Sequence, residues 1–433
     1  MADENRPNIL FILADDLGWG DVGYHGSEIR TPNIDRLRQS GVELDQHYVC
    51  PMCTPTRACL LTGRHPGRFG CHATVPSNEP VLPDGYKTLA SHLRDFGYDT
   101  GLFGKWHLGS SSRFAPNGYG FNTSYGSLAG GVDPYSHLYK RGPYSMTWHR
   151  NGELVNERGH VTDLIADEAV GWIGSRKRPW FCYVPFTAVH IPVKAPQTWL
   201  DRYEHGRYDD DQGRNRSYRE YAAYTSQMDH ATGRLLEVVR ERCEFENTIV
   251  IFASDNGAIP SNPQASVEKY PGYQEAKPRL GSNLPLRGQK AQLYEGGIRT
   301  PTIISWPGTL KPAKLDQPLH IVDWMPTFIG MMGGRPDPLW DGVDIWPVIS
   351  LERESIERSI FWNFRGSEFA LREGDWKLIS GSKGLELFNI GEDPYEENDL
   401  AAEETDIVER MVDKIGNERK QDDSQKRTDV QPK

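Results

Sequence analysis

Oxygen-bearing side chains follow two apolar segments of the chain, at the point where each segment ends. Residues Pro7 to Ala14 form a short, continuous apolar run, which predicts a buried parallel strand, and Thr248 to Ala253 predict a second one. Three carboxylates and one amide come directly after these segments: Asp15, Asp16, Asp255 and Asn256. Open α/β sheets build their sites at the carboxyl ends of strands, and an all-oxygen set suits Ca²⁺ or Mg²⁺ rather than zinc. Each pair alone is also compatible with a helix cap or an ordinary turn.

A segment between these two strands carries the pattern Cys-x-Pro-x-Arg, with Cys53 and Arg57, followed by Leu-Thr-Gly-Arg ending at Arg64. It resembles the signature segment of the type I sulfatases, in which an activating enzyme oxidises the cysteine to formylglycine before the chain folds. The resemblance implies that Cys53 is modified by a formylglycine-generating enzyme and becomes the nucleophile. It also implies that position 53 and the four oxygen ligands hold one Ca²⁺. Three fixed residues also occur by chance, so the interpretation depends on partners elsewhere in the chain.

Sulfate ester hydrolysis sets the requirements for those partners. The ester is anionic and a sugar alkoxide is a poor leaving group. The site therefore needs positive charge around the sulfate oxygens, a general acid at the bridging oxygen and an activated nucleophile.

Three further segments resemble family motifs that meet these requirements. The Gly-Lys-Trp-His-Leu-Gly stretch implies that Lys105 holds the sulfate and the formylglycine, while His107 pairs with the formylglycine hydroxyl. A predicted strand over Pro179 to Phe186 leads to His190, where the family has the histidine that touches the leaving oxygen. The Leu-Arg-Gly-x-Lys block implies that Lys290 is the second sulfate-binding lysine.

Two arginines near that block, Arg287 and Arg299, are interpreted as structural residues that pair with carboxylates such as Glu295. A lone Lys-x-His pair or a lone histidine is more often a loop or core residue, and the family pattern alone gives these residues their roles.

The resemblance implies hydrolysis by cleavage of the S–O bond. The hydroxyl of the hydrated aldehyde at position 53 attacks sulfur beside Arg57 and the Ca²⁺, and Lys105 and Lys290 stabilise the charge on the sulfate oxygens. His190 protonates the departing sugar oxygen, and His107 removes a proton as the aldehyde re-forms. The two histidine roles are interchangeable, and Asp255 is an alternative proton donor.

The likeness spans about residues 7–400 and is closest to the N-acetylgalactosamine-4-sulfatases (arylsulfatase B) and to bacterial polysaccharide sulfatases, through stretches such as Leu128 to His137. It implies a sulfated oligo- or polysaccharide substrate, with a 4-O-sulfate on galactose or N-acetylgalactosamine in a carrageenan- or chondroitin-type glycan. Asp133, His137 and Trp340 are candidates for sugar contacts, and each is equally compatible with loop packing.

Alternating strand and helix patterns predict the elements that position these residues. Helices are expected from Thr31-Pro32, from Thr88 to Gly97 and from Ser217 to Arg242. This alternation predicts an α/β fold with a large, mostly parallel sheet and helices on both faces. The resemblance implies an alkaline-phosphatase-like mixed sheet with a small C-terminal antiparallel α+β subdomain.

We expect a catalytic domain over residues 1–348, the subdomain over 349–419, and a disordered tail over 420–433. Within the subdomain, Phe369 to Ile379 predict a hairpin, Leu385 to Phe388 a strand, and Thr405 to Ile415 a closing helix.

Composition limits the alternatives. The 433 residues carry a net charge of −11, which argues against nucleic acid or an anionic membrane surface as partner, and no apolar run is long enough to span a bilayer. Six cysteines are few for a disulfide framework, and Cys50-x-x-Cys53 has no second such pair to complete a zinc site. The N-terminal residues show no signal peptide, consistent with a cytoplasmic enzyme or a mature chain, while the resemblance implies a secreted, periplasmic or lysosomal setting.

Two rival functions stay open. The first is a phosphate mono- or diester hydrolase of the same superfamily, whose members usually hold a transition metal with more histidines near the carboxylates. The second is a non-catalytic binder of sulfated glycans.

Overall fold

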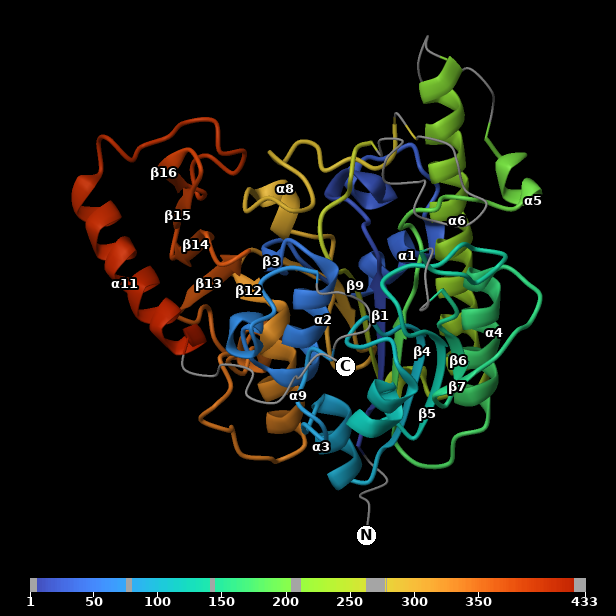
Figure 1. Ribbon diagram of the computed structural model, residues 1–433. Coiled ribbons are helices and arrows are strands. Elements are labelled where there is room, and N and C mark those ends of the chain that lie inside the picture. The colour runs from blue at the N-terminus through green and yellow to red at the C-terminus, as the bar shows by residue number, and fades with distance from the viewer. Residues whose placement is uncertain are drawn as a thin grey trace.

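The structure, a computed structural model, describes residues 6–74, 80–140, 145–203, 212–261, 277 and 279–423. The described residues form a mixed ten-stranded sheet and, beside it, a four-stranded sheet (Figure 1). In spatial order the large sheet contains β11 (Ala313–Leu315), β2 (Val42–Leu44), β10 (Ile303–Ser305), β9 (Thr248–Ser254), β1 (Asn8–Ala14), β8 (Trp180–Pro185), β4 (Asp99–Lys105), β5 (Thr123–Ser127), β6 (Trp148–Arg150) and β7 (Glu153–Leu154).

Five neighbouring strands at the centre of this sheet, β9, β1, β8, β4 and β5, run parallel. Every residue of β1 is buried, because helices cover both faces of the sheet and both alternating sets of side chains lie in a core. β10 and β6 run antiparallel to their neighbours, so the sheet is mixed and mostly parallel. The predicted fold class is confirmed.

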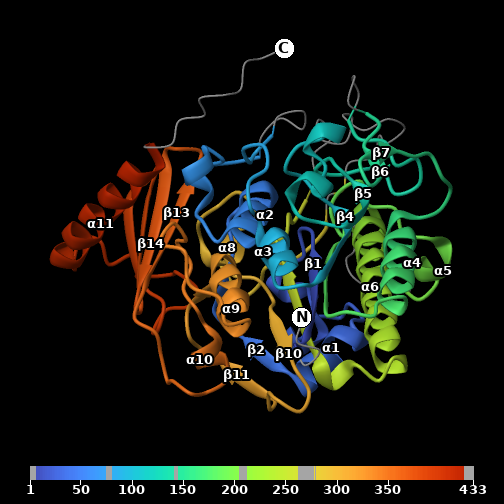
Figure 2. The ribbon, with the colours of Figure 1, turned by 90° about the horizontal axis from the view of Figure 1, so that it is seen from below.

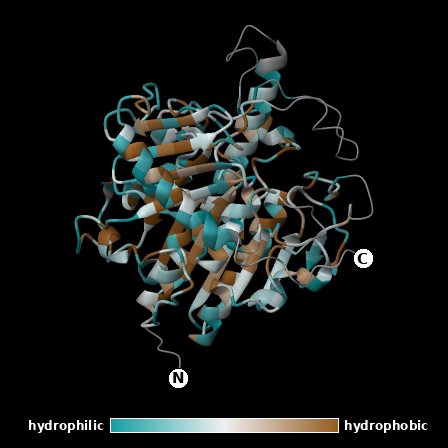
Figure 3. Cartoon of the chain, turned by 60° about the vertical axis from the view of Figure 1, so that its left-hand side comes forward, coloured by the Kyte–Doolittle hydropathy of each residue, from teal (hydrophilic) through white to brown (hydrophobic). Residues whose placement is uncertain are grey.

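Two apolar cores lie on opposite faces of the sheet. Ile9, Phe11 and Leu13 of β1 pack into one core with helices α2 (Cys53–Thr62), α3 (Leu89–Asp95) and α9 (Trp324–Met331). The alternating residues Leu10 and Ile12 pack into the other core with α1 (Pro32–Ser40), α4 (Val161–Gly174) and α6 (Gln212–Glu241). Figure 2 shows the two helical layers on either side of the strands, and Figure 3 shows apolar residues concentrated on the inner elements.

The four-stranded sheet is an antiparallel meander of β13 (Ser359–Phe364), β14 (Glu368–Glu373), β15 (Trp376–Gly381) and β16 (Gly384–Asn389). Side chains of β13 alternate between its two faces. Trp362 packs toward the large domain beside Tyr48, whereas Phe361 packs beneath α11 (Thr405–Asp423). Each face of the small sheet is therefore covered.

Other short elements are β3 (His47–Tyr48) paired with β12 (Leu319–His320), α5 (Gln197–Leu200), α8 (Glu295–Ile298) and α10 (Trp346–Ile349), together with short 3₁₀ helices such as Trp19–Asp21. We propose that the boundary between the two domains lies near residues 348 and 349, a point that α10 spans. No helix in the described part of the chain is both long enough and apolar enough to cross a bilayer.

The structure confirms the predicted strands as β1, β9 and β8 and the predicted helices as α1, α3 and α6. The C-terminal hairpin and the strand after it are confirmed as β14, β15 and β16. The closing helix was predicted too short, because α11 continues to Asp423 and includes residues 420–423, which we expected to be disordered. Arg68 explains the extension: it donates to Glu418 and Asp422, each at 2.7 Å, and thereby fastens the last turns of α11. Residues 424–433 of the predicted tail lie outside the described part of the chain.

Candidate active site

Four neighbouring parallel strands bring most of the predicted site residues to one edge of the sheet. Asp255 and Asn256 follow β9, Asp15 and Asp16 follow β1, His190 lies in the loop after β8, and Lys105 is the last residue of β4. Because β9, β1, β8 and β4 are adjacent and parallel, their carboxyl ends meet at this edge. Cys53, Arg57 and Lys290 reach the same place from α2 and from the loop before α8, as their contacts with these residues show.

Buried carboxylates pair there with buried cations. Lys105 Nζ donates to Asp15 Oδ2 at 2.7 Å, and Lys290 Nζ donates to Asp16 Oδ1 at 2.5 Å. Arg57 donates through Nη2 at 2.7 Å and through Nε at 3.2 Å to Asp255 Oδ2. The carboxylates and their partners are almost completely removed from solvent, so each charge depends on its neighbours for stabilisation.

Two oxygens in this cluster have no donor within the described part of the chain. They are Asp15 Oδ1 and Asn256 Oδ1, both fully buried. Buried polar atoms are normally satisfied, so these oxygens fit ligands for a cation. One ligand atom each of Asp15, Cys53 and Asp255 lie within 4.8 Å of one another, and the same holds for Asp15, Asp16 and His190. The acidic cluster therefore has the donor chemistry of a site for a hard divalent cation.

The pKa values of the two neighbouring aspartates move in opposite directions. Burial raises the pKa of Asp15 to about 8, because Lys105 offsets the desolvation only in part and Asp255 and Asp16 add negative charge. Burial also acts to raise the pKa of Asp16, but Lys290 and then His190 reverse the effect and hold that pKa well below its usual range. A cation bound between them would favour the ionised form of both.

Cys53 is the first residue of α2 and is only 2% exposed. Arg57 lies one turn later on the same side of the helix. Thr56 Oγ1 donates to the main-chain oxygen of Asp255 at 2.7 Å, which fastens α2 to the end of β9. Pro55 is tolerated in the first turn, where its missing N–H has no intrahelical partner. Because Cys53 at the N-terminus of α2 lies beside Asp15 and Asp255, the positive end of the helix dipole faces the site and favours a bound anion there.

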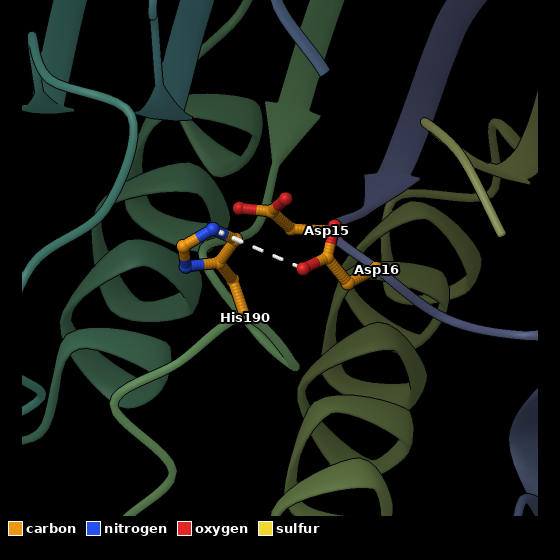
Figure 4. Close-up of side chains that lie close together, drawn as sticks. All are labelled: Asp15, Asp16 and His190. Atoms are coloured by element: carbon orange, nitrogen blue, oxygen red, sulfur yellow. Dashed lines mark ion pairs between the residues drawn. The ribbon is translucent and has the colours of Figure 1, made fainter. Parts of the chain in front are cut away.

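The two predicted histidines have different partners. His190 Nδ1 is 2.5 Å from the carbonyl oxygen of Ile191, which makes Nδ1 the donor and leaves Nε2 facing Asp16 Oδ2 at 3.8 Å (Figure 4). His107 lies beside Thr54, whose hydroxyl is 3.2 Å from both ring nitrogens. Burial lowers the pKa of His107 well below its usual value, and the nearby Lys105 and Arg57 lower it further.

The two remaining arginines contact carboxylates, although only Arg299 pairs with Glu295; their structural role stays a prediction. Arg299 lies 3.5 Å from Glu295 and 2.9 Å from Asp45. Arg287 instead stacks on Tyr294 and lies 3.7 Å from Glu386 of the small sheet.

The three candidates for sugar contacts are engaged with the protein itself. Asp133 is buried and pairs with Lys194. His137 stacks on Trp148 at 4.8 Å and lines a cavity of about 200 Å³ that residues 136–138, Met146, Val155 and Asn156 also line. Trp340 packs against the large core and meets His92 edge-on at 5.5 Å. Their contact with a sugar stays a prediction.

Sequence reasoning missed two residues that hold His107. Thr54 contacts its ring, and a Cβ on Gly130 would lie 2.2 Å from its Nε2. Thr54 is a variable position in the Cys-x-Pro-x-Arg pattern and gave no signal. Gly130 lies within the Leu128 to His137 stretch that carries the family likeness, but its proximity to His107 depends on the fold.

Comparisons with known proteins identify relatives of this chain. A family model described as "Sulfatase" matches residues 7–334. Arylsulfatase J of Mus musculus is 31% identical over 96% of this chain and 76% of its own length. N-acetylgalactosamine-6-sulfatase of Homo sapiens is 32% identical over 83% of this chain and 68% of its own length. Among solved structures, Ps i-CgsB in complex with k-i-k-neocarrahexaose has a TM-score of 0.84 at 29% identity, covering 97% of this chain and 94% of that one. Phosphonate monoester hydrolase of Agrobacterium radiobacter, at 18% identity and a TM-score of 0.67 over 96% of each chain, shares the fold.

Proposed function

The chain belongs to the sulfatase family and is a sulfuric ester hydrolase, and from this premise we propose that it removes a 4-O-sulfate from galactose or N-acetylgalactosamine in a carrageenan- or chondroitin-type glycan. One observation carries the chemical part of the proposal. Buried carboxylates and three buried cations converge on Cys53 at the carboxyl ends of four adjacent parallel strands.

The proposed cation site consists of Asp15, Asp16, Asp255 and Asn256, together with position 53. The orphaned oxygens of Asp15 and Asn256 support this assignment. A bound Ca²⁺ would supply a fixed positive charge that polarises the sulfate oxygens. Formylglycine made from Cys53 would supply the nucleophilic hydroxyl.

We assign the remaining roles to side chains that the geometry brings to that point. Lys105 and Lys290 bind the sulfate oxygens, and their buried ammonium groups stabilise the charge that develops there in a site that excludes water. Arg57 is held rigidly by Asp255 and orients α2, so that position 53 faces sulfur. We assign proton transfer to the bridging oxygen of the leaving sugar to His190, whose Nε2 must be protonated for this step while Nδ1 stays bonded to the Ile191 carbonyl. We assign to His107 the acceptance of a proton from position 53.

The substrate part rests on the relatives. Two of the named proteins support a galactose-type sugar: one is an N-acetylgalactosamine-6-sulfatase and the other was solved with a neocarrahexaose. The choice of O4 as the sulfate position rests on the resemblance of sequence stretches such as Leu128 to His137 to arylsulfatase B, whereas the human relative is named as a 6-sulfatase. We propose that Asp133 and His137, in the loop after β5, contact the sugar. We also propose that a formylglycine-generating enzyme is the partner during maturation.

Sulfate release from a panel of defined sugars tests the proposal. The purified protein, with conversion of Cys53 verified by mass, would be incubated with galactose and N-acetylgalactosamine oligosaccharides sulfated at O2, O4 or O6. We expect release from the O4-sulfated sugars and none from a Cys53→Ala protein. Release from O6 or O2 alone would contradict the proposed substrate but not the chemistry.

One observation keeps phosphate ester hydrolysis as a second candidate activity. His190 lies with Asp15 and Asp16 in a set that can hold a metal, which is the mixed histidine and carboxylate chemistry that suits a transition metal. A comparison of kcat/KM for matched sulfate and phosphate esters, with Ca²⁺ and with Mn²⁺, separates the two. A higher value for the phosphate ester with Mn²⁺ would favour the second candidate.

A further inference from the structure

A buried carboxylate outside the proposed ligand set joins three segments around the site. Asp21 is 1% exposed and lies in the short turn Trp19–Asp21, just after the proposed ligands Asp15 and Asp16. Its Oδ2 accepts from the Gly18 N–H at 2.9 Å and from the Tyr221 hydroxyl at 2.7 Å. Its Oδ1 accepts from the Ser282 N–H at 2.9 Å. One side chain therefore contacts the loop after β1, helix α6 and the segment that leads to Lys290.

The backbones of these segments approach so closely that only glycine fits at the contact. A Cβ on Gly18 would lie 2.2 Å from the carbonyl oxygen of Ser282. A Cβ on Gly281 would lie 2.5 Å from Asp21 Oδ2. The Gly20 N–H also donates to the Ser282 carbonyl at 2.9 Å. The two loops are thus in direct main-chain contact, with the Asp21 carboxylate at the junction.

Hydrogen bonds extend from this junction to the proposed sulfate-binding lysine. Asn283, next to Ser282, accepts from the Ala258 N–H at 2.7 Å and donates to the Ala258 carbonyl at 3.0 Å. The same carbonyl accepts from the Lys290 N–H at 3.2 Å. The Lys290 side chain in turn donates to Asp16, which lies in the same loop after β1 as Asp21.

We propose that Asp21 is a positioning residue that sets the separation of Asp16 from Lys290, and thereby the affinity of the site for its divalent cation and for the sulfate. The inference rests on the proposed function, because it takes Asp16 as a cation ligand and Lys290 as a sulfate ligand. Asp21 touches neither the cation nor the sulfate and acts through the two loops that it fastens together.

The chemistry of the junction requires a carboxylate. The groups that reach Asp21 are two N–H donors and a hydroxyl, and an ionised carboxylate is an acceptor at both oxygens. In an Asp21→Asn protein the amide NH₂ would face either the Ser282 N–H or the Gly18 N–H and Tyr221 hydroxyl. One loop would then lose its contact, and the buried donor would be left unsatisfied. Tyr221→Phe removes a single donor and leaves the carboxylate in place.

Calcium titration of three variants tests this inference. The variants are Asp21→Asn, Tyr221→Phe and, as a matched control, Asp35→Asn. Asp35 lies on α1, and its carboxylate likewise accepts from a main-chain N–H, that of Tyr24, and from a hydroxyl, that of Thr31, but from neither Ser282 nor Tyr221. Affinity for Ca²⁺ would be measured by calorimetry on the converted full-length protein, together with kcat and KM across a calcium series.

We expect Asp21→Asn to weaken Ca²⁺ binding roughly 10- to 100-fold, the range for loss of a residue that supports a metal ligand, with a smaller loss for Tyr221→Phe and none for Asp35→Asn. Saturating Ca²⁺ should restore much of kcat in Asp21→Asn while KM stays raised, a rescue that general destabilisation would not give. Calcium affinity within twofold of the parent in Tyr221→Phe and Asp21→Asn would overturn the inference. If Asp21→Asn does not fold, unchanged affinity in Tyr221→Phe alone would overturn it. A parent protein that hydrolyses sulfate esters without binding Ca²⁺ would instead overturn the proposed cation site and the inference with it.

Discussion

Replacement of Lys377 by methionine should destabilise the protein strongly and in a pH-dependent way. Lys377 lies on β15, and its Nζ donates to Glu295 Oε1 and to Glu396 Oε1, each at 2.8 Å. All three side chains are fully buried where the small sheet meets α8. The Lys377→Met protein keeps a side chain of similar length but leaves two facing carboxylates without their shared cation.

The magnitude follows from the burial of the trio. Removal of one partner from a buried ion pair costs about 3–5 kcal/mol, because the remaining charge is left uncompensated. Glu295 retains the Tyr48 hydroxyl at 2.9 Å and Arg299 at 3.5 Å, so the loss falls mainly on Glu396. Burial already raises the pKa of Glu396 to about 7, with Lys377 opposing the rise and Glu295 adding to it.

The sign of the pH dependence follows from that raised pKa. A carboxyl whose folded-state pKa exceeds its unfolded value binds a proton more tightly when folded, so it destabilises the fold as pH rises. Without Lys377 the pKa of Glu396 rises further. The difference in unfolding free energy between the parent and Lys377→Met should therefore be small near pH 5. It should grow above about pH 7 by up to about 1.4 kcal/mol per pH unit, and reach its full value only above the raised pKa of the variant.

Urea denaturation followed by tryptophan fluorescence at pH 5, 6.5 and 8 measures this difference. The double variant Lys377→Met/Glu396→Gln serves as the control, because it also removes the Glu396 carboxylate that lacks a partner in the single variant. It should recover part of the lost unfolding free energy at pH 8. A Lys377→Met protein within 1 kcal/mol of the parent at pH 8, or equally destabilised at pH 5 and pH 8, would refute the reasoning.

Three further predictions concern the site and the core. Arg57→Lys should lower the free energy of unfolding by roughly 3 kcal/mol, because it removes two charge-assisted donors from Asp255; an unchanged urea midpoint would contradict this. Gly130→Ala should reduce kcat at least about tenfold with a native circular dichroism spectrum, because its Cβ would displace the ring of His107, and normal turnover would show that the ring tolerates the shift. Burial lowers the pKa of His47 to about 3, so the folded state loses stability as pH falls from 6.5 toward 3, by up to about 1.4 kcal/mol per pH unit. His47→Gln should remove that dependence, and parallel pH profiles of the two proteins would count against it.

The central strands could be predicted from the sequence because their burial leaves a direct signal. β1, β9 and β8 are continuous apolar runs, and the polar residues that follow them mark the functional edge of the sheet. The adjacency of β9, β1, β8 and β4 could not be read from the chain, since it depends on long-range pairing. The roles proposed for the lysines and histidines came from the family resemblance, because residue spacing alone does not indicate them.

Other features depended on contacts that have no local signature. The helix after residue 405 continues to Asp423 because Arg68, some 350 positions earlier, pairs with its last turns. Short strands such as β11 and β2 carry too few residues for a period to be seen. Asp21 lies in a glycine-rich turn that looks ordinary until α6 and residue 282 pack onto it.

The burial of Cys53 would limit when the proposed conversion to formylglycine can take place. Every residue of α2 is buried, so no enzyme could reach position 53 once the helix has packed against β9 and the loop that carries Lys290. Those elements are made later: about 230 residues separate the signature segment from Lys290. At 5–20 residues per second, synthesis of that stretch takes roughly 10 to 50 s. If Cys53 is converted as we propose, the modifying enzyme would have to act before these elements pack, and slower translation or a chaperone that delays packing would raise the fraction of active molecules.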